Sequence, residues 1–317
     1  MRAASPWHAG ERAVQQRVGE VRLADRATGA IGAEVPPVAA EFLAQQRMLV
    51  VAATDAEGLV WASLLTGPPG FVTVPRPGVL EVAARPAPGD PLGGALAGPA
   101  LLGTLAIEPA TRRRSRQNGR STPTAGGIRI DLDQVFANCP KYIQQREVVH
   151  VGGVAGAEAG DQVAHVGDAL TGRHRRWIDG ADTLFIGTTD ADGNADASHR
   201  GGNAGFVRVL GPRKLRFPDY RGNSMYMTLG NLEQQPAAGL LFVDWTTGDL
   251  LHVSGRAAVD YDPAAARPFP GAQRVVDVEV TRVVESAHAS PLVWGEASPS
   301  RFNPPVEPVT PPGDAPA

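Results

Sequence analysis

Residues 49–72 and 184–207 of this chain are two copies of one segment, and this repeat limits the possible folds more than any other feature. The segments LVVAATDAEGLVWASLLTGPPGFV and LFIGTTDADGNADASHRGGNAGFV align at a constant offset of 135 without a gap, and 11 of the 24 positions are identical. Chance would give about two identities at average residue usage. Asn118-Gly119-Arg120 also matches Ser254-Gly255-Arg256 at an offset of 136. We infer that a whole domain is duplicated.

The repeat predicts how the 317 residues divide into domains. Two domains of ordinary size fit this length, and each is able to bury its own core. We expect an N-terminal domain over residues 1–150 and a Gly/Ala/Val-rich linker over 151–172. We expect the second domain over 173–298 and a disordered, proline-rich tail over 299–317.

The second copy predicts its own secondary structure most clearly. The apolar, β-branched run 183–189 ends in the turn Asp190-Ala191-Asp192-Gly193, and a return strand follows over 195–200. Two further hairpins, a helix over 224–235 that ends before Pro236, and a last strand over 275–284 complete the pattern. The fold class we predict is mainly β, an antiparallel β-barrel with peripheral helices, and the first copy follows the same plan.

Composition excludes several classes of protein. The 30 basic and 33 acidic residues give a net charge of −3, so nothing in the global charge favours a nucleic-acid or membrane partner. Cys139 is the only cysteine, which rules out an intrachain disulfide and a thiolate-rich metal site. We find no apolar leader, membrane-spanning run, Walker loop, nucleophile elbow or metal-spaced cluster, and we expect a cytoplasmic protein without a metal.

The difference between the copies indicates where a site lies. Leu64 and Leu65 of the first copy correspond to His199 and Arg200 of the second, so a cationic pair replaces an apolar one. A second polar segment, Asp219-Tyr220-Arg221-Gly222-Asn223-Ser224, leads into the helix predicted from residue 224. A guanidinium, a glycine and the free N–H groups of a helix start together suit a phosphate.

Simpler interpretations of the same residues stay open. Arg221 is equally expected on a solvated loop, with Asn223 or Ser224 only capping the helix. Arg200 suits a surface salt bridge, and His199 suits a hydrogen-bonded position in the barrel. Arg112, Arg114 and Arg116 alternate, so they would share one face of a strand, either as a cationic wall of a cleft or as a solvated edge strand.

These motifs resemble a known family. Ala-Asp-Ala-Ser-His-Arg-Gly-Gly, Phe-Pro-Asp-Tyr-Arg-Gly-Asn, Gly-Leu-Leu-Phe-Val-Asp-Trp and Leu-His-Val-Ser-Gly-Arg-Ala follow one another as in the FMN-binding split barrels related to pyridoxamine 5′-phosphate oxidase. Asn138-Cys139-Pro140-Lys141-Tyr142-Ile143 resembles the two-barrel branch of that superfamily. The resemblance implies tandem duplicated FMN-binding split barrels, with FMN in a cleft between two barrels.

The resemblance also implies roles for residues. Ser198, His199, Arg200 and Gly201 would border the flavin ring or ribityl chain, and Tyr220, Arg221, Asn223 and Ser224 would surround its phosphate. Lys141 and Arg116 would reach across the cleft from the first copy. FMN is the expected cofactor, with FAD or a deazaflavin left open. A homodimer is expected because such barrels pair, although the first copy is an alternative partner face within the chain.

The function implied is an FMN-dependent oxidoreductase that acts on a small molecule, with a reduced nicotinamide as a possible electron donor. Positive charge from Arg200 or His199 near the ring would stabilise the reduced flavin. Pyridoxal phosphate synthesis is not expected, because the chain lacks the family's basic last strand and Arg-Leu-Ala-Pro end. The alternative is a non-catalytic flavin-binding barrel with a sensing, storage or interaction role. The residues identify no catalytic base and no substrate.

Overall fold

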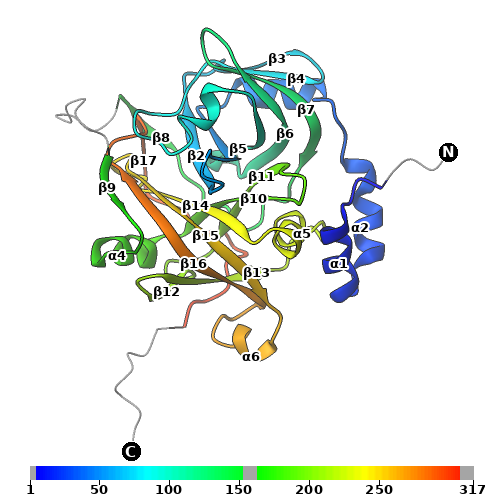
Figure 1. Ribbon diagram of the computed structural model, residues 1–317, viewed down its shortest axis with the longest axis vertical. Helices are drawn as coiled ribbons and strands as arrows, with labels where there is room; N and C mark the ends of the chain where they lie inside the picture. Colours follow the sequence, from blue (N-terminus) through cyan, green and yellow to red (C-terminus); the bar gives the residue numbers. More distant parts are fainter. Residues whose placement is uncertain (1–4, 153–162, 308–317) are drawn as a thin grey trace, which may run out of the picture.

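The computed structural model describes residues 5–152 and 163–307, and it is mainly β with few helices. Two large antiparallel sheets form the body of the molecule (Figure 1). In Figure 1 the first sheet, blue to green, lies above the second, green to orange. The predicted fold class is therefore confirmed at the level of a mainly β, antiparallel structure.

The first sheet has seven strands in the order β2-β1-β5-β6-β7-β4-β3. Their bounds are β1 (Met48–Thr54), β2 (Val60–Thr66), β3 (Val72–Arg76), β4 (Val79–Val82), β5 (Ala100–Glu108), β6 (Arg113–Pro123) and β7 (Ile128–Ala137).

The second sheet has eight strands, seven of which follow the order β11-β10-β14-β15-β16-β13-β12 while β9 pairs with β16. Their bounds are β9 (Val163–Gly167), β10 (Thr183–Thr189), β11 (Ala195–Gly201), β12 (Arg208–Gly211), β13 (Lys214–Tyr220), β14 (Ala237–Val243), β15 (Leu250–Asp260) and β16 (Ala272–Ser286). A small third sheet pairs β17 (Leu292–Trp294) with β8 (Val148–Val151).

The two sheet orders are the same once each strand is replaced by its counterpart in the other copy. β1 and β10, like β2 and β11, begin 135 residues apart, which is the offset of the sequence repeat. The duplication in the sequence is thus a duplication of strand topology.

A shared bulge explains one of the repeated motifs. The register of β6 against β7 shifts at Asn118/Gly119, and that of β15 against β16 shifts at Ser254/Gly255. A Cβ on Gly119 or on Gly255 would lie 2.1 Å from the carbonyl oxygen of Asp131 or Glu279, respectively. Glycine is repeated here because the partner backbone comes too close for any side chain.

The helices lie at the periphery. They are α1 (Ala9–Arg17), α2 (Val21–Ala27), α3 (Pro37–Ala44), α4 (Gly172–Gly180), α5 (Met227–Gln234) and α6 (Pro263–Ala266), with 3₁₀ turns at η1 (Thr28–Ala30), η2 (Ala95–Ala97) and η3 (Pro109–Thr111). Although α1 and α2 precede the first sheet in sequence, α1 packs against α5 of the second copy and α2 packs against α1, at the right of Figure 1.

One core cluster joins the two copies. It contains side chains of β1 and β5 from the first copy and of β10, β14 and β15 from the second, among them Met48, Val50, Leu105, Phe185, Leu241 and Leu250. All of them are almost fully buried. Burial of this much apolar surface holds the two sheets together as one body.

Two predicted boundaries need correction. Residues 163–167, expected in the linker, form β9, whose residues pair with Val283–Ser286 of β16. Residues 299–307 were expected in a disordered tail, but they contact the rest of the protein. The amide of Ser300 donates to Gln144 Oε1 at 2.8 Å, and Val306 packs against the hydrophobic core of the second copy. Proline-rich composition did not reveal these contacts. Residues 153–162 of the predicted linker and residues 308–317 of the predicted tail lie outside the described residues.

No helix among the described residues is long and apolar enough to cross a membrane.

Candidate functional site

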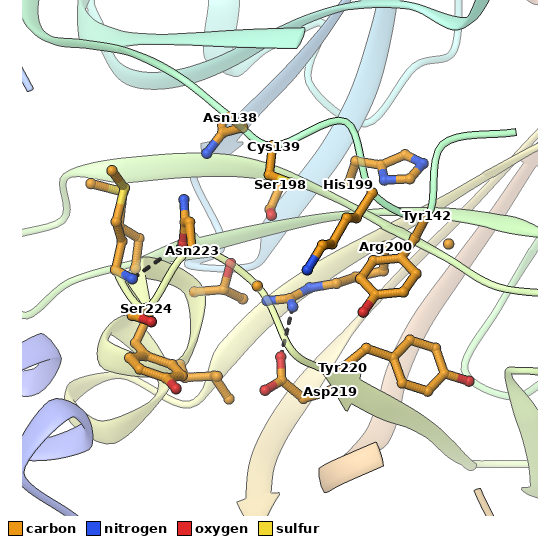
Figure 2. Close-up of a pocket in the computed structure, with 18 of the residues that line it drawn as sticks. Asn138, Cys139, Tyr142, Ser198, His199, Arg200, Asp219, Tyr220, Asn223 and Ser224 are labelled. Atoms are coloured by element: carbon orange, nitrogen blue, oxygen red, sulfur yellow. Dashed lines mark hydrogen bonds and ion pairs between the residues drawn. The ribbon is translucent and has the colours of Figure 1, made fainter. Parts of the chain in front are cut away.

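A cavity of about 800 Å³, counted with its open mouth, lies between the two copies. One wall consists of β11, the end of β13 and the segment that leads into α5; the other consists of β6 and residues 138–142 of the first copy. Figure 2 shows Ser198 and Arg200 on one side of this space and Asn223 and Ser224 across it. The lining residues are Arg114, Arg116, Asn138, Cys139, Lys141, Tyr142, Ser198, His199, Arg200, Gly201, Pro218, Asp219, Tyr220, Gly222, Asn223, Ser224, Met225, Tyr226, Met227, Thr228 and Leu229.

Arg116 connects the two copies at the base of the cavity. Its Nη1 donates to both carboxylate oxygens of Asp196 at 2.9 and 3.1 Å, and its Nη2 donates to Ser198 Oγ at 2.6 Å. Arg116 is only 8% exposed, and its Nε has no hydrogen-bond acceptor in the described part of the chain. The guanidinium is thus fixed by β11 and retains one unused donor.

Arg114 lies two residues earlier on the same face of β6 and holds His199. Its Nη1 contacts His199 Nδ1 at 3.1 Å, and its Nε donates to the Cys139 carbonyl at 2.9 Å. Because a guanidinium can only donate, Nδ1 must accept, and the ring proton is assigned to Nε2. Burial and the charges of Arg116 and Arg200 lower the pKa of Arg114 to about 9.

His199 is neutral. Burial, followed by the positive charges of Arg114 and Arg200, lowers the pKa of its imidazole well below the ordinary value of 6.5. Of the two residues predicted to supply positive charge to a flavin, Arg200 or His199, the neighbouring arginines oppose protonation of His199 and so favour Arg200. That either residue lies beside a flavin stays a prediction.

Arg200 is held by a carboxylate that a second arginine shares. Its Nη1 donates to Asp219 Oδ1 at 2.7 Å, the contact drawn as a dashed line in Figure 2. On the other side of Asp219, Arg274 Nε lies 3.4 Å from Oδ2. Buried nitrogens of both arginines, Nε of Arg200 and Nη1 of Arg274, have no acceptor among the described residues.

The segment before α5 has unusual backbone geometry. Ser224 and Tyr226 have φ angles of 63° and 62°, in the left-handed region that non-glycine residues seldom occupy. Asn223 Oδ1 accepts from the amide of Met225 at 3.2 Å, and the helix begins at Met227, three residues later than predicted. Strain of this kind collects at binding sites.

Positive charge dominates the cavity. Four cationic side chains line it, those of Arg114, Arg116, Lys141 and Arg200, whereas Asp219 is the only carboxylate among the lining residues. Lys141 also lies over the ring of Phe302, with its Nζ 5.6 Å from the centroid. An excess of cations around one cavity favours an anionic ligand.

The structure brings nine of the ten predicted site residues to this cavity: Arg116, Lys141, Ser198, His199, Arg200, Gly201, Tyr220, Asn223 and Ser224. Arg221 is exposed and does not line it; its carbonyl accepts from the hydroxyl of Tyr142 at 3.1 Å. Gly201 serves packing, because a Cβ there would lie 2.0 Å from the Tyr142 carbonyl oxygen. That any of these residues binds a cofactor stays a prediction.

Arg112 departs from the predicted row of three arginines. It precedes β6 with a φ of 56°, and its Nε donates to the carbonyl of Ile143 at 3.0 Å, so it does not line the cavity. Sequence reasoning also missed Asp196, Asp219 and Arg274 as partners of the arginines. Asp196 and Asp219 lie inside the two polar motifs, and this position could have indicated them as partners. Nothing in the sequence around Arg274 indicates that it belongs to the same cluster.

The corresponding place in the first copy is closed. Ser63 is the counterpart of Ser198, and at the offset of 136 His252 is the counterpart of Arg116. Ser63 donates to the carboxylate of Asp90, and His252 Nε2 lies 3.4 Å from Ser63 Oγ, all three side chains being buried. Leu64 and Leu65 are buried beside them. Only one of the two related positions therefore forms this cavity.

Part of the chain is similar to known proteins. Residues 170–302 match the family model described as pyridoxamine 5′-phosphate oxidase. Among solved structures the chain is similar to HupZ from Group A Streptococcus, with 16% identity and a TM-score of 0.30 over 36% of this chain and 91% of that one. It is also similar to an FMN-binding protein from Syntrophomonas wolfei, with 12% identity and a TM-score of 0.26 over 35% and 82% of the two chains.

A third similar structure is an F420 reductase, with 16% identity and a TM-score of 0.27 over 37% of this chain and 95% of that one. No curated protein gives a significant match.

Proposed function

Because residues 170–302 of this chain belong to the pyridoxamine 5′-phosphate oxidase-like family of FMN-binding split barrels, we propose that the protein is an FMN-dependent oxidoreductase acting on a small molecule. The proposal includes a second, degenerate split barrel in the N-terminal half, whose strand order repeats that of the C-terminal half. Both halves contribute side chains to one flavin site.

The observation that supports this most strongly is the set of cationic side chains that line the cavity between the copies. Four cationic groups line it against one carboxylate. The Nε atoms of Arg116 and Arg200 are buried without an acceptor among the described residues. Unpaired buried groups are costly, so a ligand that supplies acceptors and negative charge would stabilise them. A flavin phosphate and the carbonyl edge of a flavin ring have this chemistry.

The residues divide into roles by position. Ser198, Arg200 and Arg116 would lie along the flavin, and Asn223 and Ser224 would receive its phosphate end. A bound flavin supplies the redox chemistry, and the protein supplies orientation and charge. Arg200, fixed by Asp219, is the group that would hold positive charge beside the flavin. Neutral His199, fixed by Arg114, would preserve the shape of the wall without adding charge.

The site is assembled within one chain in this proposal. Arg114 and Arg116 come from β6 of the first copy and approach β11 of the second, as a partner subunit would in a dimer of single barrels. The predicted homodimer is therefore not needed to form this cavity. Light scattering of the purified protein measures whether the chains pair as well.

The test begins with the absorption spectrum of the purified protein and mass spectrometry of any released yellow ligand. We expect one FMN per chain; FAD or a deazaflavin would revise the cofactor. Arg200→Ala should weaken FMN binding at least tenfold, as expected for the loss of a charge-assisted hydrogen bond. Arg208→Ala is the matched control, because Arg208 lies over Phe269 outside the cavity.

Turnover separates the enzyme from its alternative. The enzyme should oxidise a reduced nicotinamide or a related donor in the presence of a small acceptor. A stably bound flavin that no donor reduces would favour the non-catalytic flavin-binding role, and failure to bind any flavin would overturn the proposal.

A further inference from the structure

The N-terminal helices cover one side of the candidate site. At the offset of 135, the positions that correspond to α1 are residues 144–152, which contain strand β8 instead of a helix. α1 packs closely on α5: a Cβ on Gly10 would lie 2.0 Å from the Gly230 carbonyl oxygen. His8 Nε2 lies 2.9 Å from Asn231 Oδ1. α1 is thus docked closely on α5, beside which both N-terminal helices lie in Figure 1.

Glu20, at the start of α2, reaches the wall of the cavity. Its Oε2 accepts from the Tyr226 hydroxyl at 2.7 Å. Partial burial acts to raise the pKa of Glu20, but the hydroxyls of Ser224 and Tyr226 and the charges of Arg221 and Arg274 outweigh burial and lower it. The Glu20 carboxylate thus accepts a hydrogen bond from Tyr226, a residue that lines the cavity.

Arg274 supplies a second cation behind this contact. Its guanidinium lies 5.2 Å from the Tyr226 ring centroid, it is 3% exposed, and its Nη1 has no acceptor in the described part of the chain. Asp219 is already shared with Arg200. The Glu20 carboxylate thus takes up the hydroxyl of a residue whose ring packs against an incompletely satisfied guanidinium.

We propose that Glu20 competes with the phosphate end of the flavin for the Tyr226 hydroxyl, so that Glu20 determines how strongly the site distinguishes a phosphorylated flavin from the same flavin without its phosphate. This inference rests on the proposed function. Donors that hold a carboxylate also suit a phosphate, because both are oxygen anions that accept from hydroxyls. A phosphate and the Glu20 carboxylate repel each other when they lie close together. The phosphate must therefore displace Glu20 or bind more weakly because of its negative charge.

The test compares FMN with riboflavin, which lacks the phosphate, in the wild type and in Glu20→Gln. Glutamine retains the size of the side chain and an acceptor for Tyr226 but removes the negative charge. We expect FMN to bind about tenfold more tightly to Glu20→Gln, as for one charge-assisted contact, while the riboflavin dissociation constant changes less than about twofold. Glu20→Ala should show the same selective gain.

The matched control is Glu233→Gln. Glu233 also ties the N-terminal helices to α5, through Arg17 Nη1 at 2.6 Å, but its side-chain partners Arg17 and Tyr261 do not line the cavity. Glu233→Gln should change the affinities for FMN and for riboflavin by the same factor. If Glu20→Gln and Glu20→Ala also affect the two flavins equally, or leave both affinities unchanged, the inference is wrong. If neither flavin binds to the wild type or to any variant, the proposed function itself fails and this inference fails with it.

Discussion

The guanidinium of Arg116, on β6 of the first copy, donates to both carboxylate oxygens of Asp196, on β11 of the second, at 2.9 and 3.1 Å. Both side chains are less than a tenth exposed. The pair thus fixes the distance between the two copies where the cavity lies. A buried ion pair of this kind favours a specific arrangement more than it adds stability.

The pair should behave as a unit when it is mutated. Arg116→Met leaves the Asp196 carboxylate buried with Asn118 as its remaining side-chain donor, and we expect a loss of about 3 kcal/mol in the free energy of unfolding. Urea denaturation measures this loss. The double variant Arg116→Met/Asp196→Asn should lose less than the sum of the single variants by at least about 1 kcal/mol. Additive losses would show that the pair does not couple the copies energetically.

The buried cluster of Ser63, Asp90 and His252 in the first copy should contribute to the stability of the protein and not to flavin binding. Asp90→Ala removes the acceptor of the buried Ser63 hydroxyl and the neighbour of His252. We expect it to lower the free energy of unfolding by about 2 kcal/mol, the cost of unsatisfied buried groups.

Flavin titration of Asp90→Ala should still saturate at one flavin per chain with an unchanged dissociation constant. A second flavin per chain, or a loss of the first, would contradict this division between the copies.

Glu11 should make stability depend on pH. Burial, with the nearby charges of Asp196 and Asp190, raises its pKa to about 8 from the ordinary 4.5. The folded protein therefore retains a proton that the unfolded chain releases above pH 4.5. The resulting stability is fully present below that value and is lost as the pH rises through about 8.

Glu11→Gln should lack this loss, since glutamine is equally suited to the capping box that Glu11 forms with His8. The variant should match the wild type near pH 5 and exceed its free energy of unfolding by on the order of 2 kcal/mol at pH 9. A difference that stays constant from pH 5 to 9 would contradict the raised pKa.

The repeated bulge glycines should be equally intolerant of a side chain. Gly119→Ala and Gly255→Ala each place a Cβ 2.1 Å from a backbone oxygen, so we expect each to destabilise the protein by at least about 2 kcal/mol. Gly126→Ala is the control, because a Cβ at Gly126 meets no atom within 4 Å. Its melting temperature should stay near that of the wild type. A tolerated alanine at either bulge would mean that the strands shift to accommodate it.

The sequence predicted the local parts of this fold well. Asp190 Oδ1 accepts from the amides of Asp192 and Asn194, both at 2.9 Å, which is the turn predicted between the strands now seen as β10 and β11. Turns, bulges and strand periodicity depend on residues close in sequence, so a duplicated segment preserves them. The same reasoning placed the helix three residues too early, because the left-handed Ser224 and Tyr226 delay its start.

By itself, then, the sequence determined the duplication, the strands and turns of each copy and the two polar segments from which a site is built. Only the tertiary structure decided that Arg114 and Arg116 face those segments while Arg112 turns away, that Arg274 stands behind Asp219, and that Glu20 reaches Tyr226 from 206 residues away. These contacts follow from how two sheets and a helix pair dock. Docking depends on the shape and charge of whole surfaces, which the spacing of residues along one strand does not specify.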